Sequence, residues 1–189
     1  MHDIEPFYRW DKYYSATDDT RSPYKDYEAD YQTYQNEIYG YFIHPDWVYF
    51  GSETLYLKIL FTDYDEGVTV IELFGEWNDT LHNDVMHLKR NIVEALVHEG
   101  ITKFILIGEG IINFHGNETD YYEEWFEEIE DGWIAAVNFR EFVEKEFTRF
   151  QIDYYINFGG ELAEVDTWRV MTPWDFITHI SSLITRRLT

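Results

Sequence analysis

The spacing of apolar residues predicts an ordered series of strands and helices in the second half of the chain. Two runs at 55–61 and 68–74 flank an acidic turn that ends in glycine, which predicts a β-hairpin. The second run is almost wholly apolar or β-branched, as in a central strand buried on both faces. Residues 80–99 have helical periodicity, and 103–107 form another buried run. This order predicts a hairpin, a crossover helix and a strand parallel to the hairpin's second member.

The helix at 80–99 has recognisable ends. Asn78, Asp79 or Thr80 can cap its start, and Gly100 lies where a left-handed residue ends a helix. We expect its buried stripe to consist of Leu81, Val85, Leu88, Ile92 and Leu96.

The remaining C-terminal segments extend this alternation. Residues 117–132 predict an acidic helix, with Tyr121, Trp125 and Ile129 on one side. Trp133–Val137 fits either a strand or the start of a helix, and the pairing of Asn138 with Glu141 as a capping box favours a strand followed by a helix. We further expect a strand at 152–158, a short edge strand at 168–171 and a helix at 173–187 that Thr172, Pro173 and Asp175 begin.

The N-terminal part is rich in tyrosine. Ser22 and Pro23 form a helix-start signal. Apolar residues recur behind it at spacings of three and four, which predicts a helix that packs on the domain or on a second copy of the chain; they are Tyr24, Tyr27, Tyr31, Tyr34 and Ile38. A short strand at 38–43 would follow.

Together the patterns predict one α/β domain. We expect a mixed sheet of about five strands with helices on its faces at 51–189, preceded by an acidic, aromatic-rich extension at 1–50.

Composition changes the picture mainly through charge. The 189 residues include 37 acidic and 14 basic side chains, a formal net charge of −23, and 20% are aromatic. So many aromatic residues argue for a folded acidic protein rather than a disordered one. Binding to nucleic acid or to an anionic membrane is disfavoured, since both require a basic surface. There is no cysteine and no run of 18 apolar residues, and the first residues lack the pattern of a signal peptide, so we expect a cytoplasmic protein.

One constellation suggests chemistry. Three predicted strands each end in glycine followed by glutamate, at Glu76, Glu109 and Glu161. If these strands are parallel, the three carboxylates gather at one edge of the sheet, where ligands bind in open α/β sheets. They could hold Mg²⁺ or Mn²⁺, with Asp79 and Glu53 in reserve, or a pair could act as acid and base. The alternative is that these glycines simply allow the chain to turn at the ends of strands, and that the glutamates after them have no shared role.

Histidine offers a second candidate. His115 follows the third strand and lies near the same predicted edge, where it could act as a general base. Glu94 and His98 are four residues apart on the predicted helix and could share a metal, although a solvated helix face also fits them. The sequence has no dinucleotide-binding, P-loop, zincin or nucleophile-elbow motif.

From residue 55 to 187 the order of elements resembles the STAS domain of the anti-sigma-factor-antagonist type. The similar parts are the hairpin, the strand that leads into Gly75-Glu76, the long helix, and the segment from Lys103 to Phe114. In that family the following loop typically carries a phosphorylatable serine. Here the loop has no serine, and Thr119 is its only hydroxyl. The resemblance thus implies a fold but not the phosphorylation switch.

We therefore expect a non-catalytic regulatory or protein-interaction domain that binds a protein partner or associates with itself. The alternative is a metal-dependent enzyme that uses the carboxylate cluster.

Overall fold

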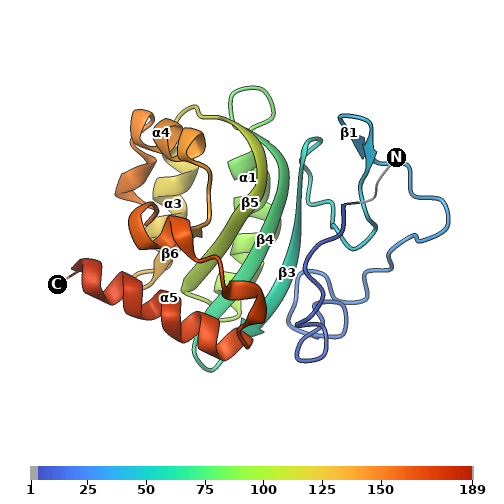
Figure 1. Ribbon diagram of the computed structural model, residues 1–189, viewed down its shortest axis with the longest axis horizontal. Helices are drawn as coiled ribbons and strands as arrows, with labels where there is room; N and C mark the ends of the chain where they lie inside the picture. Colours follow the sequence, from blue (N-terminus) through green and yellow to red (C-terminus); the bar gives the residue numbers. More distant parts are fainter. Residues whose placement is uncertain (1–3, 189) are drawn as a thin grey trace.

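The structure is a computed structural model that describes residues 4–188. A four-stranded sheet in the order β3-β4-β5-β6 forms its centre (Figure 1). The strands are β3 (Leu55–Asp63), β4 (Val68–Asn78), β5 (Lys103–His115) and β6 (Trp133–Val137). β3 pairs with β4 in antiparallel orientation, and the β4–β5 and β5–β6 pairs are parallel. The mixed α/β fold and the parallel pairing of 68–74 with 103–107 are thus confirmed.

Helices cover the first face of the sheet. One helix has three consecutive parts: α1 (Asp84–Leu88), a π-helical turn η1 (Lys89–Val93) and α2 (Glu94–His98). It packs beside α3 (Asp120–Glu128) and α4 (Glu141–Arg149). Alternate strand residues such as Ile71 and Leu106 face these helices, because successive side chains of a strand point to opposite faces.

The second face is covered by α5 (Pro173–Leu188) and by the start of the chain. Val70 and Ile105 point to this side, where they meet Phe176 and Ile180 of α5 together with Trp10. The helix begins with the expected capping pair, since the Asp175 amide donates to Thr172 Oγ1 and that hydroxyl donates to the Asp175 carboxylate. A sheet buried on both faces explains why residues 68–74 of β4 are almost all apolar or β-branched.

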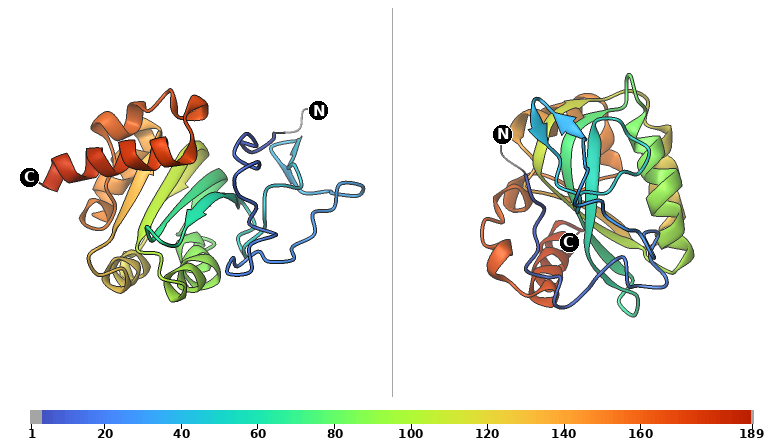
Figure 2. Two further views of the ribbon diagram at one scale, coloured as in Figure 1. Left: turned by 90° about the horizontal axis from the view of Figure 1, so that it is seen from below. Right: turned by 90° about the vertical axis from the view of Figure 1, so that its right-hand side faces the viewer.

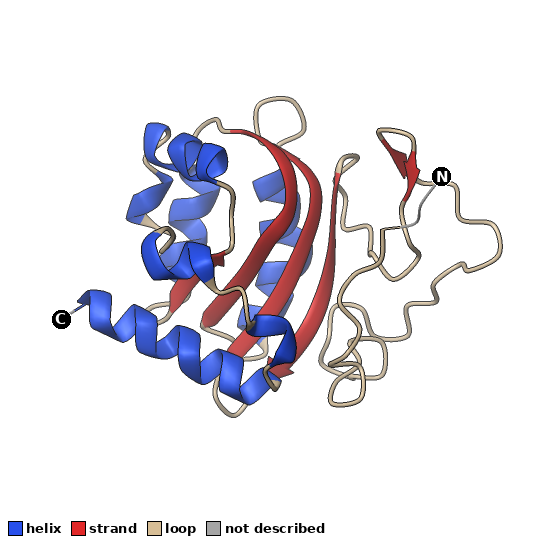
Figure 3. Cartoon of the chain, in the orientation of Figure 1, coloured by secondary structure: helices blue, strands red, loops and turns tan. Residues whose placement is uncertain are grey.

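The N-terminal extension lies beyond β3 and consists mostly of turns (Figures 2 and 3). Its regular part is a two-stranded hairpin, β1 (Glu37–Ile38) and β2 (Tyr41–Phe42), in place of the single strand expected at 38–43. The predicted helix at 24–38 is wrong. Asp26 has a left-handed backbone, and the Ser22 and Asp30 side chains accept hydrogen bonds from nearby amides, which favours turns over a helical ladder.

Two predicted strands are also wrong. Residues 152–158 contain the 3-10 helix η2 (Ile152–Tyr154), and the following chain touches β6 through the bridge between Ala135 and Asn157. Ile152 and Ile156 are both buried and four residues apart, a helical spacing. Residues 168–171 hold the 3-10 helix η4 (Trp168–Val170) instead of an edge strand, because Trp168 turns inward while Val170 stays exposed. The central sheet therefore has four strands, within the predicted mixed sheet of about five.

Helix ends differ from the sequence patterns in smaller ways. The first helix starts at Asp84, so Leu81 lies outside it and is 76% exposed, whereas the other four members of the predicted stripe are buried. None of the predicted caps occupies the N-cap position, which is Asn83. The Asp79 carboxylate nevertheless accepts a 2.9 Å hydrogen bond from the Val85 amide in the first turn. Trp133–Val137 is a strand followed by a helix, as the sequence favoured, but Asn138 does not cap α4. Its side chain instead bonds Val165 and Glu109.

Candidate functional site

The extension protects the outer edge of β3. Val48 and Leu57 exchange two backbone hydrogen bonds of 2.8 and 3.3 Å, so the extension adds one antiparallel bridge to that edge. An uncovered edge strand presents unpaired amides and carbonyls that favour aggregation. The extension is therefore integral to the fold, and it forms a surface of its own next to the sheet.

Three aromatic residues hold the extension in place. Trp10 is 2% exposed, donates from Nε1 to the Met171 carbonyl at 2.9 Å, and packs at 5.7 Å from the Trp168 ring. Phe7 lies 4.7 Å from the same Trp168 ring. Trp47 stacks on Phe74 of β4 with ring centroids 5.4 Å apart. Burial of large aromatic side chains contributes strongly to packing energy, so this segment is tightly attached.

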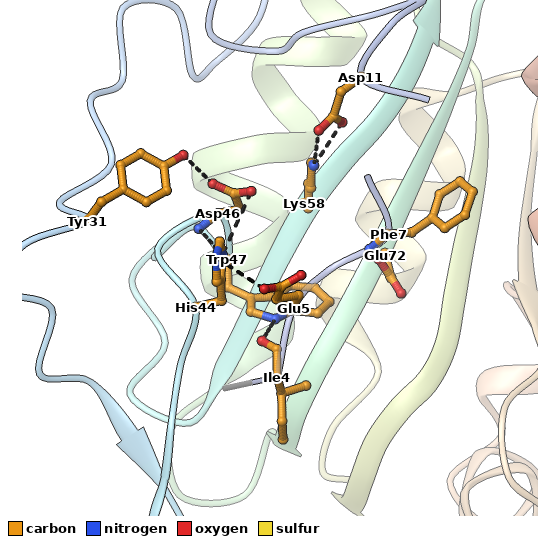
Figure 4. A network of polar contacts seen from close by, with 10 residues as sticks. All are labelled: Ile4, Glu5, Phe7, Asp11, Tyr31, His44, Asp46, Trp47, Lys58 and Glu72. Carbon is orange, nitrogen blue, oxygen red and sulfur yellow. Dashed lines mark hydrogen bonds and ion pairs between the residues drawn. The ribbon is translucent and has the colours of Figure 1, made fainter. Parts of the chain in front are cut away.

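Polar contacts join the extension to β3 and also connect residues within the extension (Figure 4). Lys58 Nζ of β3 lies 2.8 and 3.1 Å from the two carboxylate oxygens of Asp11. Tyr31 donates to Asp46 at 2.5 Å, and this hydrogen bond, with partial burial, raises the pKa of Tyr31 to about 12. His44 Nδ1 lies 3.7 Å from the other oxygen of Asp46. The extension thus carries several carboxylates beside tyrosine rings.

A buried carboxylate lies under the start of the chain. Glu72, in the middle of β4, is 7% exposed and accepts a 2.7 Å hydrogen bond from the Phe7 amide. Burial raises the pKa of Glu72 to about 7, and the Phe7 bond and the charge of Arg169 oppose that rise. The sequence pattern did not single out Glu72, because a lone glutamate within an apolar run can be either exposed at the edge of a sheet or buried inside it.

Exposed tyrosines gather on the extension. Thirteen large apolar or aromatic side chains are exposed among the described residues, and seven of them are tyrosines between residues 8 and 49. They are Tyr8, Tyr13, Tyr27, Tyr31, Tyr39, Tyr41 and Tyr49. About a quarter of the chain therefore supplies more than half of the exposed aromatic and large apolar groups.

The glycine–glutamate pairs do not end strands as the sequence suggested. Gly75 lies inside β4 with φ +117° at an irregularity of the sheet, where a Cβ would lie 2.1 Å from the Thr54 carbonyl oxygen. Gly108 lies inside β5, and a Cβ there would meet the Phe139 ring at 2.3 Å. Close packing explains both glycines. Glu76 and Glu109 accordingly sit within strands.

The three glutamates have separate partners. Glu109 binds Arg169 at 2.5 Å and accepts hydrogen bonds from Trp168 Nε1 and Asn138 Nδ2. Burial disfavours its charge, but these bonds prevail and lower its pKa. Glu76 accepts a hydrogen bond from the Tyr39 hydroxyl. Glu161 lies in the 3-10 helix η3 (Gly160–Glu164), exposed, 3.4 Å from Arg186.

These glutamates therefore form no common ligand set in the described part of the chain. Their role as metal ligands stays a prediction, and their arrangement argues against one shared site. His115 ends β5, is exposed, and its Nε2 lies 2.9 Å from Asn113 Nδ2. Its role as a general base likewise stays a prediction.

One group of carboxylates does converge, but a lysine occupies its centre. Carboxylate oxygens of Glu94, Glu124 and Glu128 lie within 4.8 Å of one another. Lys89 in the π-helical turn is fully buried, and its Nζ lies 3.3, 3.5 and 2.8 Å from them, respectively. Arg90 also binds Glu94 and Glu124. The ammonium takes the place that a cation would need, so this network joins the helix to α3.

Two further buried carboxylates, Asp79 and Asp84, lie just after the end of β4. Asp79 is 3% exposed and accepts hydrogen bonds from Trp77 Nε1, the Val85 amide and the Tyr122 hydroxyl. Burial raises the pKa of Asp79 to about 6. Asp84 is fully buried, and its Oδ1 has no hydrogen-bond partner among the described residues. Asn78, Asp79 and Thr80 indicated a helix start in the sequence, but nothing in the sequence predicted the burial of Asp79 and Asp84.

Two solved structures show a low similarity to the chain. No family model matches the chain, and no curated protein matches it. The anti-sigma factor antagonist SpoIIAA in its unphosphorylated form matches 56% of this chain and 90% of its own, with 19% identity and a TM-score of 0.38. The Bacillus cell fate determinant SpoIIAA in the phosphorylated form matches 61% and 99%, with 17% identity and the same score. The structural resemblance to this type of protein, expected from the sequence, is thus observed at low identity.

Among residues 4–188, no helix is both long and apolar enough to cross a bilayer.

Proposed function

We propose that this protein is a non-catalytic protein-binding module whose contact surface is the tyrosine-rich face of residues 24–49. The observation that carries the proposal is the concentration of exposed tyrosines on the extension, among them Tyr31 at 62%, Tyr39 at 67% and Tyr49 at 55% exposure. Tyrosine is enriched in protein interfaces, because it supplies a large contact area and a polar hydroxyl while only two side-chain torsions become fixed.

The attachment of the extension supports this proposal. The backbone bridge between Val48 and Leu57 and the buried Trp47 fix the segment that carries the tyrosines. A surface held in place before binding loses less entropy when a partner docks. The exposed rings are therefore suited to direct contact.

Charge indicates what kind of partner fits. At a net charge of −23, long-range attraction favours a partner with a basic face and speeds its association at low salt. A second copy of the chain carries the same charge and would be repelled at a distance, so we favour a different protein over a homodimer. The absence of cysteine suits a reducing compartment such as the cytoplasm.

Site-specific photocrosslinking in the native host tests the proposal. The photoreactive amino acid p-benzoylphenylalanine replaces Tyr31 in one variant and Tyr39 in another. A matched control places it at Tyr154, which is 71% exposed but belongs to η2, outside the extension. We expect both extension variants to give the same single adduct with another protein, and the control to give none.

Two results would refute the proposal. One is the same adduct from the Tyr154 position, which would indicate unspecific collision. The other is no adduct from either extension position when the variants accumulate normally. An adduct of twice the chain's own mass would instead assign the surface to self-association.

A further inference from the structure

A cavity of about 470 Å³ lies between the extension and the outer edge of the sheet. Its wall combines three stretches far apart in sequence: turns within residues 11–31, the loop at 45–48, and Lys58 and Ile59 of β3. Pockets for small molecules commonly enclose roughly 300–1,000 Å³. The cavity is thus large enough for a small organic ligand.

Tyrosine rings make up much of the wall. Tyr14, Tyr24, Tyr27 and Tyr31 all line it, and the rings of Tyr24 and Tyr27 meet edge to face at 6.0 Å. The face of an aromatic ring carries partial negative charge and attracts cations. Tyr24 is 8% exposed, and its hydroxyl has no hydrogen-bond partner among the described residues. A buried hydroxyl without a hydrogen bond is costly, so a ligand that bonded the Tyr24 hydroxyl would remove a cost that the protein alone leaves in this wall.

The charged residues of the wall point to the same ligand chemistry. The wall contains three aspartates and one lysine, a net formal charge of −2. Lys58 is bound by both oxygens of Asp11, and no lysine or arginine among the described residues binds Asp18 or Asp46. Asp46 accepts a hydrogen bond from the Tyr31 hydroxyl and lies 3.7 Å from His44 Nδ1, so its charge is only partly balanced. An anion would meet repulsion here, whereas a cation would be attracted by the carboxylates and by the tyrosine rings of the wall.

The spacing of the carboxylates favours an organic cation over a metal ion. Among the described residues, the carboxylate oxygens of the three wall aspartates do not all lie within 4.8 Å of one another. A metal ion needs its ligands at about 2–2.6 Å, in close convergence. Charges spread around an aromatic wall instead suit an extended molecule with an ammonium or guanidinium end.

We propose that this cavity binds a small organic cation, namely an ammonium or guanidinium group on an apolar or aliphatic body. The cavity wall shares Tyr27 and Tyr31 with the protein-contact surface proposed above, but the two proposals have separate readouts. Loss of the crosslinked adduct would leave cation binding intact, and absence of cation binding would leave the adduct intact.

Titration calorimetry with the full chain tests the site. The probes are agmatine and benzylamine, with benzyl alcohol as the neutral partner of benzylamine. An arginine tripeptide blocked at both ends is a fourth probe. We expect saturable one-to-one binding of the cations and none of benzyl alcohol. If agmatine binds with higher affinity than the tripeptide, the natural ligand is a free amine. If the tripeptide binds with higher affinity, the natural ligand is a protein side chain. Either order supports the site.

Charge-matched variants separate this site from general attraction to an acidic protein. Asp46→Asn and Asp18→Asn each remove one wall charge and should weaken cation binding roughly tenfold, as expected for loss of a partly screened ion pair. Asp153→Asn removes an exposed aspartate in η2 and should leave binding unchanged. Asp18 lies on the surface, so its variant remains informative if Asp46→Asn unfolds. Absence of saturable binding, or equal weakening by Asp153→Asn, would overturn the proposal.

Discussion

The backbone amide of Phe7 donates a 2.7 Å hydrogen bond to the carboxylate of Glu72, which lies 65 positions further along the chain. This bond joins the start of the extension to the middle of β4. It also places a carboxylate in a region that disfavours charge, and burial raises its pKa to about 7.

The first prediction concerns Glu72 and pH. Its pKa is higher in the folded protein than the ordinary value of 4.5, so the folded state holds the proton more tightly. The stability contributed by this proton is complete below pH 4.5 and is lost as pH rises to about 7, a change on the order of 3 kcal/mol. Glu72→Gln should therefore flatten the fall in unfolding free energy across this range. Urea unfolding at several pH values measures it.

The surface variant Glu164→Gln is the control for that experiment, because it removes the same charge outside the buried site. It should retain the wild-type pH dependence. A Glu72→Gln profile parallel to the wild type would show that Glu72 does not titrate in this range.

The second prediction concerns the attachment of the extension. Trp10→Ala removes a ring that is 2% exposed and packed against Trp168 and Phe176. Loss of a buried tryptophan should destabilise the fold by about 3–5 kcal/mol. Tyr8→Ala, two positions away and 60% exposed, should change stability by less than about 0.5 kcal/mol. Equal denaturation midpoints for Trp10→Ala and wild type would mean that the extension is dispensable.

The third prediction concerns Lys89. Lys89→Met removes the ammonium between Glu94, Glu124 and Glu128, which should destabilise the protein by about 1–3 kcal/mol through uncompensated carboxylate repulsion. Ca²⁺ should then raise the melting temperature of this variant more than that of wild type, since the converging oxygens become available to it. Lys145→Met, on the exposed side of α4, is the control and should respond to Ca²⁺ as wild type does. Equal Ca²⁺ responses of Lys89→Met and wild type would contradict the prediction.

The fourth prediction separates Glu109 from Glu161, another of the three glycine–glutamate positions. Glu109→Gln weakens the contact with Arg169 inside a half-buried network and should cost about 1–2 kcal/mol. Glu161→Gln should cost less than about 0.5 kcal/mol, because Glu161 is exposed. Thermal unfolding of both variants measures the difference.

A triple variant of Glu76, Glu109 and Glu161 to glutamine addresses metal binding. We expect Mg²⁺ and Mn²⁺ to shift its melting temperature as much as that of wild type, because the three side chains have separate partners. Disappearance of the shift would show that they do share a metal.

Local patterns in the sequence were sufficient for the core strands and most helices. Residues 68–74 of β4 and 103–107 of β5 are largely apolar or β-branched, and the stripe from Val85 to Leu96 repeats at helical spacing, so each element follows from its own residues. The parallel order of β4 and β5 followed from the crossover helix between them. Gly100 ended that helix with a left-handed backbone, as its position predicted.

Contacts between distant residues decided the remainder. The packing of Phe139 on Gly108 and the position of Thr54 against Gly75 turned two apparent strand ends into strand interiors, which separated the glutamates. The tyrosines at 24–38 have helical spacing, but the backbone there forms turns. Hydrogen bonds from backbone amides to the Ser22 and Asp30 side chains and contacts near β3 set this conformation. The sequence determined which segments are regular and how acidic the surface is. Only the tertiary structure decided which carboxylates are buried, which are paired, and which face the tyrosine-lined cavity, because each of these depends on residues far apart in the chain.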